Sequence, residues 1–140
     1  MVDTTTYVDV NIFVYWLGNH PEFGETACNW IKKIDNSKQK KYVTSSLTLY
    51  ETLVIIAGLS GKNLRDKAFT EAVVSSMIHI KGLAIEPLTS EDFIKAVDLM
   101  KDYNIDHEDA LHLAVALRKG AQEIISNDID FDRTPIRRNL

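Results

Sequence analysis

The feature that most constrains the fold is a strand-like run that ends in an acid. Residues 4–10 are rich in Thr, Tyr and Val, which suit a buried strand. Asp9 closes this run, and an amphipathic helical pattern over residues 11–18 follows at once. In open α/β sheets the ligand crevice lies at the carboxyl ends of the strands, so the sequence places Asp9 at such an edge.

The rest of the chain repeats the alternation of strand and helix. Further strands are predicted at residues 41–44, 83–86 and 122–126. Further helices are predicted at residues 21–35, 46–58, 64–80, 90–103 and 106–119. This order indicates a three-layer α/β/α sandwich with a central parallel sheet, formed by one domain over residues 1–140.

Several boundaries and faces can be predicted from local patterns. Thr89 to Asp92 resembles a capping box, and Gly120 suits the C-terminal cap of the helix before it. Helical spacing predicts that Phe93, Val97 and Met100 are buried. Residues 64–80 carry apolar side chains on more than one face, which suits either an interface or additional core contacts.

Composition excludes several classes of protein. The 140 residues are 45% apolar and 26% charged, as in ordinary soluble domains. No apolar run is long enough to cross a membrane, and no basic segment precedes an apolar one, so we expect a cytoplasmic protein. A single cysteine, Cys28, excludes an internal disulfide and a multi-cysteine metal site.

The net charge of −4 does not indicate a nucleic-acid binder, but the basic residues are clustered. The three clusters are Lys32, Lys33, Lys38, Lys40 and Lys41; Lys62, Arg65 and Lys67; and Arg133, Arg137 and Arg138. Each cluster alone is interpreted as solvated helix ends and loops. Together they would suit the flanks of an acidic cleft that binds phosphates.

Four carboxylates stand out by their context: Asp9, Glu51, Asp109 and Asp128. Asp128 ends the fourth strand as Asp9 ends the first. Asp109 lies in the first turn of its helix, in line with apolar residues. Each also has a structural interpretation, since Asp9 suits an N-cap, Asp109 favours the helix dipole and Asp128 suits a turn.

Glu51 is the least ordinary of the four. Its helical neighbours at the same face are Leu47, Val54 and Ile55, so the pattern predicts an acid on a core-facing stripe. Burying a carboxylate is costly unless something pairs with it. A Lys or Arg from a neighbouring helix would suffice, and so would a bound cation.

The four acids together point to a metal site. Adjacent parallel strands lie about 5 Å apart, so acids at their ends can converge. Clustered carboxylates raise one another's pKa values unless a cation lies among them. An all-oxygen donor set favours Mg²⁺ or Mn²⁺, with one or two ions and a phosphate completing the coordination.

Four stretches resemble the signature motifs of PIN-domain nucleases, and in particular the small VapC-type toxin ribonucleases. They are residues 7–11, 45–51, 109–114 and 126–132. The resemblance covers nearly the whole chain, with the acids in the family's order. One departure is the C-terminus, which ends so soon after the last motif that a final strand is either short or absent.

The resemblance implies an endoribonuclease that depends on Mg²⁺ or Mn²⁺, with Asp9, Glu51, Asp109 and Asp128 as catalytic metal ligands. It implies supporting roles for Asn11, Asn127 and Asp130, with Asp132 of second rank. Its expected partners are single-stranded RNA, an antitoxin protein and a second copy of the chain. His112 is interpreted as a packed or surface residue rather than a ligand.

Other functions fit less well. A phosphatase of the haloacid dehalogenase type needs a second Asp where Asn11 stands, and a receiver domain needs an acid pair before its first helix. Ser45, Ser46 and Ser126 have no His or Lys base nearby in sequence, so covalent catalysis is not favoured. A housekeeping nuclease in RNA processing and a non-catalytic PIN-like RNA-binding module remain alternatives.

Overall fold

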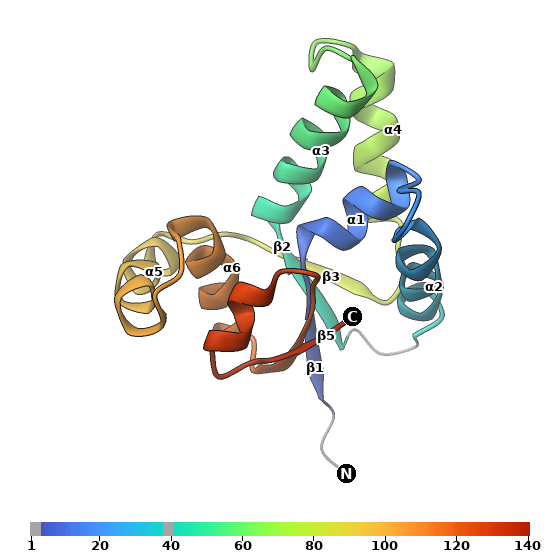
Figure 1. Cartoon of the computed structure of the whole chain (residues 1–140). Helices are drawn as coiled ribbons and strands as arrows, with labels where there is room; N and C mark the ends of the chain where they lie inside the picture. Colours follow the sequence, from blue (N-terminus) through green and yellow to red (C-terminus); the bar gives the residue numbers. More distant parts are fainter. Residues whose placement is uncertain (1–3, 38–40) are drawn as a thin grey trace.

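The computed structural model describes residues 4–37 and 41–140, and its centre is a five-stranded parallel sheet (Figure 1). The strands stand in the order β3-β2-β1-β4-β5. They are β1 (Thr5–Val8), β2 (Tyr42–Ser45), β3 (Leu83–Glu86), β4 (Ala121–Ile125) and β5 (Arg137–Asn139). Lys38 and Lys40 of the first basic cluster lie outside the described residues.

Helices cover both faces of the sheet, which confirms the three-layer α/β/α fold (Figure 1). The helices are α1 (Val10–Leu17), α2 (Gly24–Asp35), α3 (Ser46–Ser60), α4 (Lys67–Ile78), α5 (Ser90–Tyr103) and α6 (His107–Arg118), with a short 3-10 helix η1 (Ile129–Arg133). Helices α5 and α6 lie on one side of the sheet and α1 and α2 on the other. Helices α3 and α4 extend away as a pair.

Two hydrophobic clusters hold these layers together, and the strands supply both. Tyr7 and Ile124 face the cluster under α5 and α6. Their neighbours Val8 and Ile125 face the cluster under α1 and α2. Successive side chains of a strand point to opposite faces, so strands of four or five residues can serve both cores.

The predicted helix boundaries on α5 and α6 are confirmed. Thr89 and Asp92 form a capping box at the start of α5. Gly120 follows α6 with a φ of 73°, a left-handed conformation that glycine adopts without strain. Helix α3 extends beyond the predicted end at residue 58 and stops at Gly61, which has a φ of 64°.

The predicted buried face of α3 is confirmed for Glu51 and for the partly buried Leu47, but it is wrong for Val54 and Ile55. Val54 and Ile55 are about two-fifths exposed, whereas Thr48, Thr52 and Ile56 are buried. The Thr52 hydroxyl donates to the carbonyl oxygen of Thr48 at 2.7 Å. Because this bond satisfies the hydroxyl, threonine can occupy core positions that an apolar pattern does not reveal.

Two other helices also differ from their predicted patterns. In α5 the buried side chains are Asp92, Ala96 and Leu99, so the predicted burial of Phe93 and Val97 is wrong. Both of those are about half exposed. Helix α4 begins at Lys67, after the N-cap Asp66, and not at residue 64.

The C-terminus does complete the sheet with a short strand, β5, paired in parallel with β4. The third basic cluster serves this region. Its three arginines form ion pairs within the fold: Arg133 with Asp130, Arg137 with Glu123 and Arg138 with Asp132. These guanidinium groups therefore contact the protein's own acids, although Arg137 stays largely exposed.

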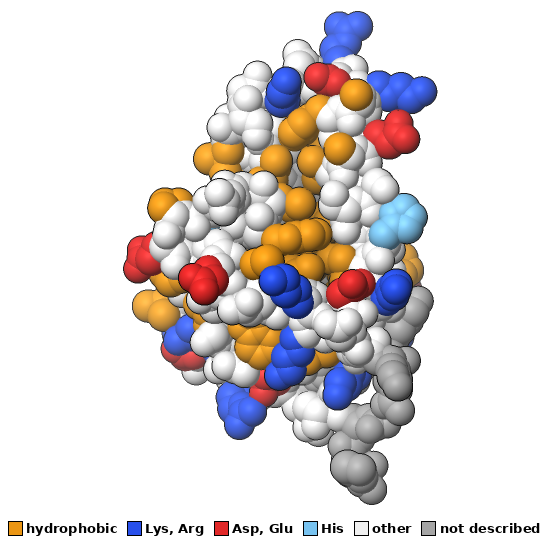
Figure 2. Space-filling view, turned by 90° about the vertical axis from the view of Figure 1, so that its right-hand side faces the viewer, with side chains coloured by type: hydrophobic (Ala, Val, Ile, Leu, Met, Phe, Trp, Pro, Cys, Tyr) orange, Lys and Arg blue, Asp and Glu red, His pale blue; other side chains and the backbone are white. Residues whose placement is uncertain are grey.

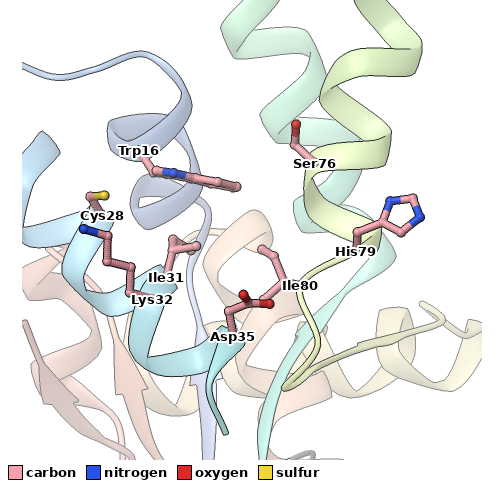
Figure 3. Close-up of a pocket in the computed structure, with 8 residues that line it drawn as sticks. All are labelled: Trp16, Cys28, Ile31, Lys32, Asp35, Ser76, His79 and Ile80. Atoms are coloured by element: carbon pink, nitrogen blue, oxygen red, sulfur yellow. The ribbon is translucent and has the colours of Figure 1, made fainter.

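A groove separates α2 from α4 on the face shown in Figure 2, where hydrophobic side chains gather in a central band with basic ones around it. It contains a cavity of about 280 Å³ (Figure 3). Trp16 of α1 reaches over the space between the two helices. The lining residues are Trp16, Cys28, Ile31, Lys32, Asp35, Ser76, His79 and Ile80.

Among the described residues, no helix is long and apolar enough to span a membrane.

An ion pair between the buried Asp92 of α5 and the partly exposed Arg118 of α6 joins the two helices. Burial alone would raise the pKa of Asp92, but hydrogen bonds from Arg118 and Thr89 hold that pKa below its ordinary value. The pair therefore stabilises the fold above the carboxyl's unfolded-state pKa, and this stability is lost as the pH falls through the lower folded-state pKa. Asp92→Asn should cost about 2 kcal/mol at pH 7.

Urea unfolding at pH 7 and at pH 2.5 measures this effect. The difference between Asp92→Asn and wild type should shrink at the lower pH. The exposed neighbour Glu91 offers a matched control, since Glu91→Gln removes the same charge from the same turn. An equal loss of stability in both variants would contradict the assignment.

Candidate metal centre

The carboxyl ends of β1 and β4 form the natural crevice of this sheet. From β1 the chain continues to β2 on one side, while β4 pairs with β1 on the other. Such a reversal of strand order is where open α/β sheets bind ligands. Asp9 directly follows β1, and Ser126 directly follows β4.

Asp9 is buried and is held by hydrogen bonds to both of its oxygens. Oδ1 accepts from the backbone N of Val10 at 2.8 Å. Oδ2 accepts from Ser126 Oγ at 2.6 Å and from Asn11 Nδ2 at 3.3 Å. Burial raises the pKa of Asp9, although His112 and these hydrogen bonds act in the opposite direction. Asp9 is therefore both the N-cap of α1 and a carboxylate of the crevice.

The two predicted asparagines have different positions. Asn11 joins the loops, because its Nδ2 donates to Asp9 and its Oδ1 accepts from the backbone N of Asn127 at 3.3 Å. The Asn127 side chain donates to Tyr15 Oη at 3.1 Å. Asn11 thus contacts a carboxylate of the crevice directly, whereas Asn127 supports the loop.

Three further acids meet beside Asp9. Asp109, Asp128 and Asp130 each offer a carboxylate oxygen within 4.8 Å of the others. Burial, and then the charges of Asp128, Asp106 and Asp9, raise the pKa of Asp109 to about 7. The structure therefore brings Asp9, Asp109 and Asp128 into one electrostatic group.

Glu51 belongs to an adjoining group on α3 and α6. Its Oε1 lies 2.7 Å from His112 Nε2, and its carboxylate faces that of Glu108. The contact with Glu51, followed by burial, raises the pKa of Glu108 to about 7. Glu51 Oε2 is buried with no hydrogen-bond partner. Its partner is thus a histidine and not the Lys or Arg that the sequence suggested.

His112 is completely buried and links the two groups. Its Nδ1 lies 2.7 Å from Tyr7 Oη. Burial would lower the pKa of His112, but Tyr7, Glu51 and Asp9 together hold that pKa well above its ordinary value. The same histidine therefore interacts electrostatically with both Asp9 and Glu51.

This arrangement fits a hard divalent cation. The acids of the crevice supply only oxygen ligands, which suits Mg²⁺ or Mn²⁺. The raised pKa of Asp109 and the orphaned Oε2 of Glu51 both show negative groups that lack a full complement of donors. A cation between the carboxylates would remove the repulsion that raises their pKa values.

Comparison with known proteins assigns the family. The family model of the PIN domain matches residues 6–137. The chain belongs to the PIN domain family. This confirms the resemblance seen in the sequence motifs. No curated protein matches the chain.

Solved structures of similar fold include several toxins. One is VapC20 of Mycobacterium tuberculosis, a sarcin-ricin loop cleaving toxin, with a TM-score of 0.71 and 20% identity. The match covers 95% of this chain and 99% of that chain. The structure of VapBC2 from Rickettsia felis, bound to a DNA fragment from its promoter, has a TM-score of 0.68 and 18% identity. The match covers 97% of this chain and 98% of that chain. A toxin–antitoxin complex from Klebsiella pneumoniae has a TM-score of 0.62 and 19% identity. The match covers 95% of this chain and 99% of that chain.

Sequence reasoning missed the contacts of five polar residues around the acids of this PIN domain. They are Tyr7, Ser45, Glu108, His112 and Ser126. Tyr7, Ser45 and His112 lie in strands or in an apolar helical run, where the pattern indicates core positions, and Glu108 resembles an ordinary acid in the first turn of a helix. Only Ser126, which separates an apolar strand from Asp128, gave a positional signal.

The charge of the cluster predicts how stability depends on pH without divalent ions. A folded-state pKa raised to about 7 means that Asp109 favours folding at low pH, and that this contribution is lost as the pH rises from about 4 through 7. In EDTA the wild-type melting temperature should therefore fall between pH 5.5 and pH 8. Asp109→Asn should reduce that fall by about 4 °C, after discounting for its partial exposure.

Scanning calorimetry at the two pH values provides the measurement. Asp98 is an exposed aspartate on the neighbouring helix α5, so Asp98→Asn is the matched control and should leave the fall unchanged. If Asp109→Asn and the control behave alike, the carboxylates are not packed closely enough to repel each other.

Proposed function

We propose that this PIN domain is a Mg²⁺- or Mn²⁺-dependent endoribonuclease that hydrolyses phosphodiester bonds of RNA. The observation that carries the proposal is the convergence of Asp9, Asp109 and Asp128 at the crevice between β1 and β4. Single-stranded RNA is the proposed substrate, because unpaired strands fit narrow clefts.

The chain's own residues have separate roles in this proposal. Asp9, Asp109 and Asp128 would hold the ion, with Glu51 completing the acidic site. Ser126 and Asn11 fix the position of Asp9 by donating to its Oδ2, and the bond from Ser126 favours its ionised form. When bound, the ion lowers the pKa of a water ligand and stabilises negative charge on the phosphate.

No serine is available as a nucleophile in this arrangement. Ser126 Oγ donates to Asp9 and accepts from the backbone N of Asp128 at 2.9 Å. Ser45 Oγ accepts from Tyr7 Oη and from the backbone N of Thr48. Both hydroxyls therefore hold other groups in position, which supports hydrolysis by water over covalent catalysis.

We further propose that the protein is the toxin of a toxin–antitoxin pair. The support is its likeness in fold to VapC20 and to the toxin–antitoxin complexes from Rickettsia felis and Klebsiella pneumoniae. An antitoxin protein is then the expected partner, and homodimer formation and a cytoplasmic location belong to the same proposal. A housekeeping nuclease would share the site but would have no antitoxin.

The central prediction concerns Asp9. Asp9→Asn keeps the side chain's size and one acceptor oxygen, but removes the charge that the ion requires. Metal-dependent cleavage should fall by roughly 100-fold or more, because even partners outside the metal's direct ligands contribute 10- to 100-fold. Cleavage of a mixed pool of single-stranded RNA with Mn²⁺ measures this.

Two controls make the result interpretable. Asp102→Asn removes an equivalent charge from the exposed end of α5 and should cleave like wild type. EDTA should abolish the wild-type activity, and added Mn²⁺ should restore it. Cleavage that persists in EDTA or in a folded Asp9→Asn variant would overturn the proposal, and Mn²⁺ binding without cleavage would indicate the non-catalytic binding module.

A further inference from the structure

We propose that His112 is a positioning residue, which holds the Glu51 carboxylate so that one of its oxygens remains free for the cation. The inference rests on the proposed function, since it assigns a role within the same acidic site. The family match covers residues 6–137 and assigns no role to His112 or Tyr7. Its basis is the geometry of a buried polar network that runs through the core.

The two oxygens of Glu51 have different environments. Oε1 is 2.7 Å from His112 Nε2, and Oε2 is buried without a hydrogen-bond partner. The Glu51 side chain is only 10% exposed and that of His112 only 2%, so bulk water does not replace these contacts. A buried, unpartnered carboxylate oxygen is costly. The facing Glu108 carboxyl can pair with Glu51 only when one of the two acids carries a proton, whereas a bound cation satisfies the oxygen with both acids ionised.

The direction of the bond between the two side chains follows from chemistry. An ionised carboxylate can only accept, so Nε2 must carry the hydrogen. The Tyr7 hydroxyl donates its one hydrogen to Ser45 Oγ, so Nδ1 donates to Tyr7 Oη and both ring nitrogens of His112 carry hydrogens. Nε2 is thus the donor to Glu51.

Further contacts hold the imidazole in place. Tyr7 Oη lies 2.7 Å from Nδ1, and the two rings meet edge-on with their centroids 5.8 Å apart. Thr48 Oγ1 lies 3.5 Å from the same nitrogen. Tyr7 Oη also donates to Ser45 Oγ at 3.0 Å. Residues from β1, β2, α3 and α6 thus fix the ring.

This rigidity explains why the site needs a histidine here. A glutamate on a helix has three side-chain torsions, and its carboxylate would otherwise sample several orientations. A fixed donor selects one orientation before the ion arrives, as partners of metal ligands commonly do. Tyr7 in turn fixes the position of His112, which fixes the position of the Glu51 carboxylate.

The test compares two amides at residue 112. In His112→Gln the amide nitrogen can replace Nε2 as the donor to Glu51, whereas the shorter side chain in His112→Asn can replace only Nδ1. The affinity for Mn²⁺ is measured without RNA, by titrating the protein with Mn²⁺ and monitoring the free ion by electron paramagnetic resonance. We expect Asn to weaken binding about 10-fold and Gln to remain within about threefold of wild type.

Additional variants separate positioning from stability. Leu113→Val perturbs the next, equally buried residue of α6 and should leave the Mn²⁺ affinity unchanged. Tyr7→Phe should weaken binding by less than His112→Asn, and it provides the test if the Asn variant does not fold. In a Glu51→Gln background, His112→Asn should have no further effect, since it acts through Glu51.

The outcomes distinguish this inference from the proposed function. Wild-type affinity in both His112→Asn and Tyr7→Phe, or additive losses in the double variant, would overturn the positioning role while leaving the nuclease proposal intact. If the wild-type protein itself binds no Mn²⁺, the proposed function and this inference fail together.

Discussion

The structure depends on how the Asp9 carboxyl group is held where β1 ends inside the protein. Burial raises its pKa, and three donors hold its oxygens in place: the backbone N of Val10, Ser126 Oγ and Asn11 Nδ2. These donors come from α1 and from the loop after β4, so one side chain joins the two halves of the sheet. The acid that closes the first strand is thus part of the fold's own bonding.

Much of this could be predicted from the sequence, because it is local. Strands, caps and the order of elements follow from short-range patterns. Asp9 follows β1 as predicted, whereas Asp128 does not end β4 but lies three residues beyond it, as the N-cap of η1. The buried face of α3 was predicted only in part, since Thr48 and Thr52 occupy core positions with hydroxyls bonded to the backbone or to other side chains. The apolar stripe through Val54 instead lies at the surface, beside Glu51.

The environment of Glu51 was beyond sequence reasoning for a different reason. Its partner His112 lies 61 residues away, between Leu111 and Leu113 on another helix. Nothing in the spacing of α3 or α6 specifies how the two helices face each other, because tertiary packing sets that angle. The sequence indicated that Glu51 needed a partner, but only the fold shows which one.

The distribution of basic residues completes the electrostatic argument. Arg118, Arg133, Arg137 and Arg138 all form ion pairs, and each pairs with an acid outside the Asp9, Asp109 and Asp128 group. Within the described ranges no Lys or Arg forms an ion pair with those three acids, although η1 and β5 beside them carry arginines. Asp130, which lies beside Asp109 and Asp128, does pair with Arg133, and His112 and Arg138 also interact with the cluster. The chain's own cations therefore compensate the central acids only in part. Self-neutralisation would have stabilised the fold, so the remaining negative charge is best explained by a cation that binds from solution.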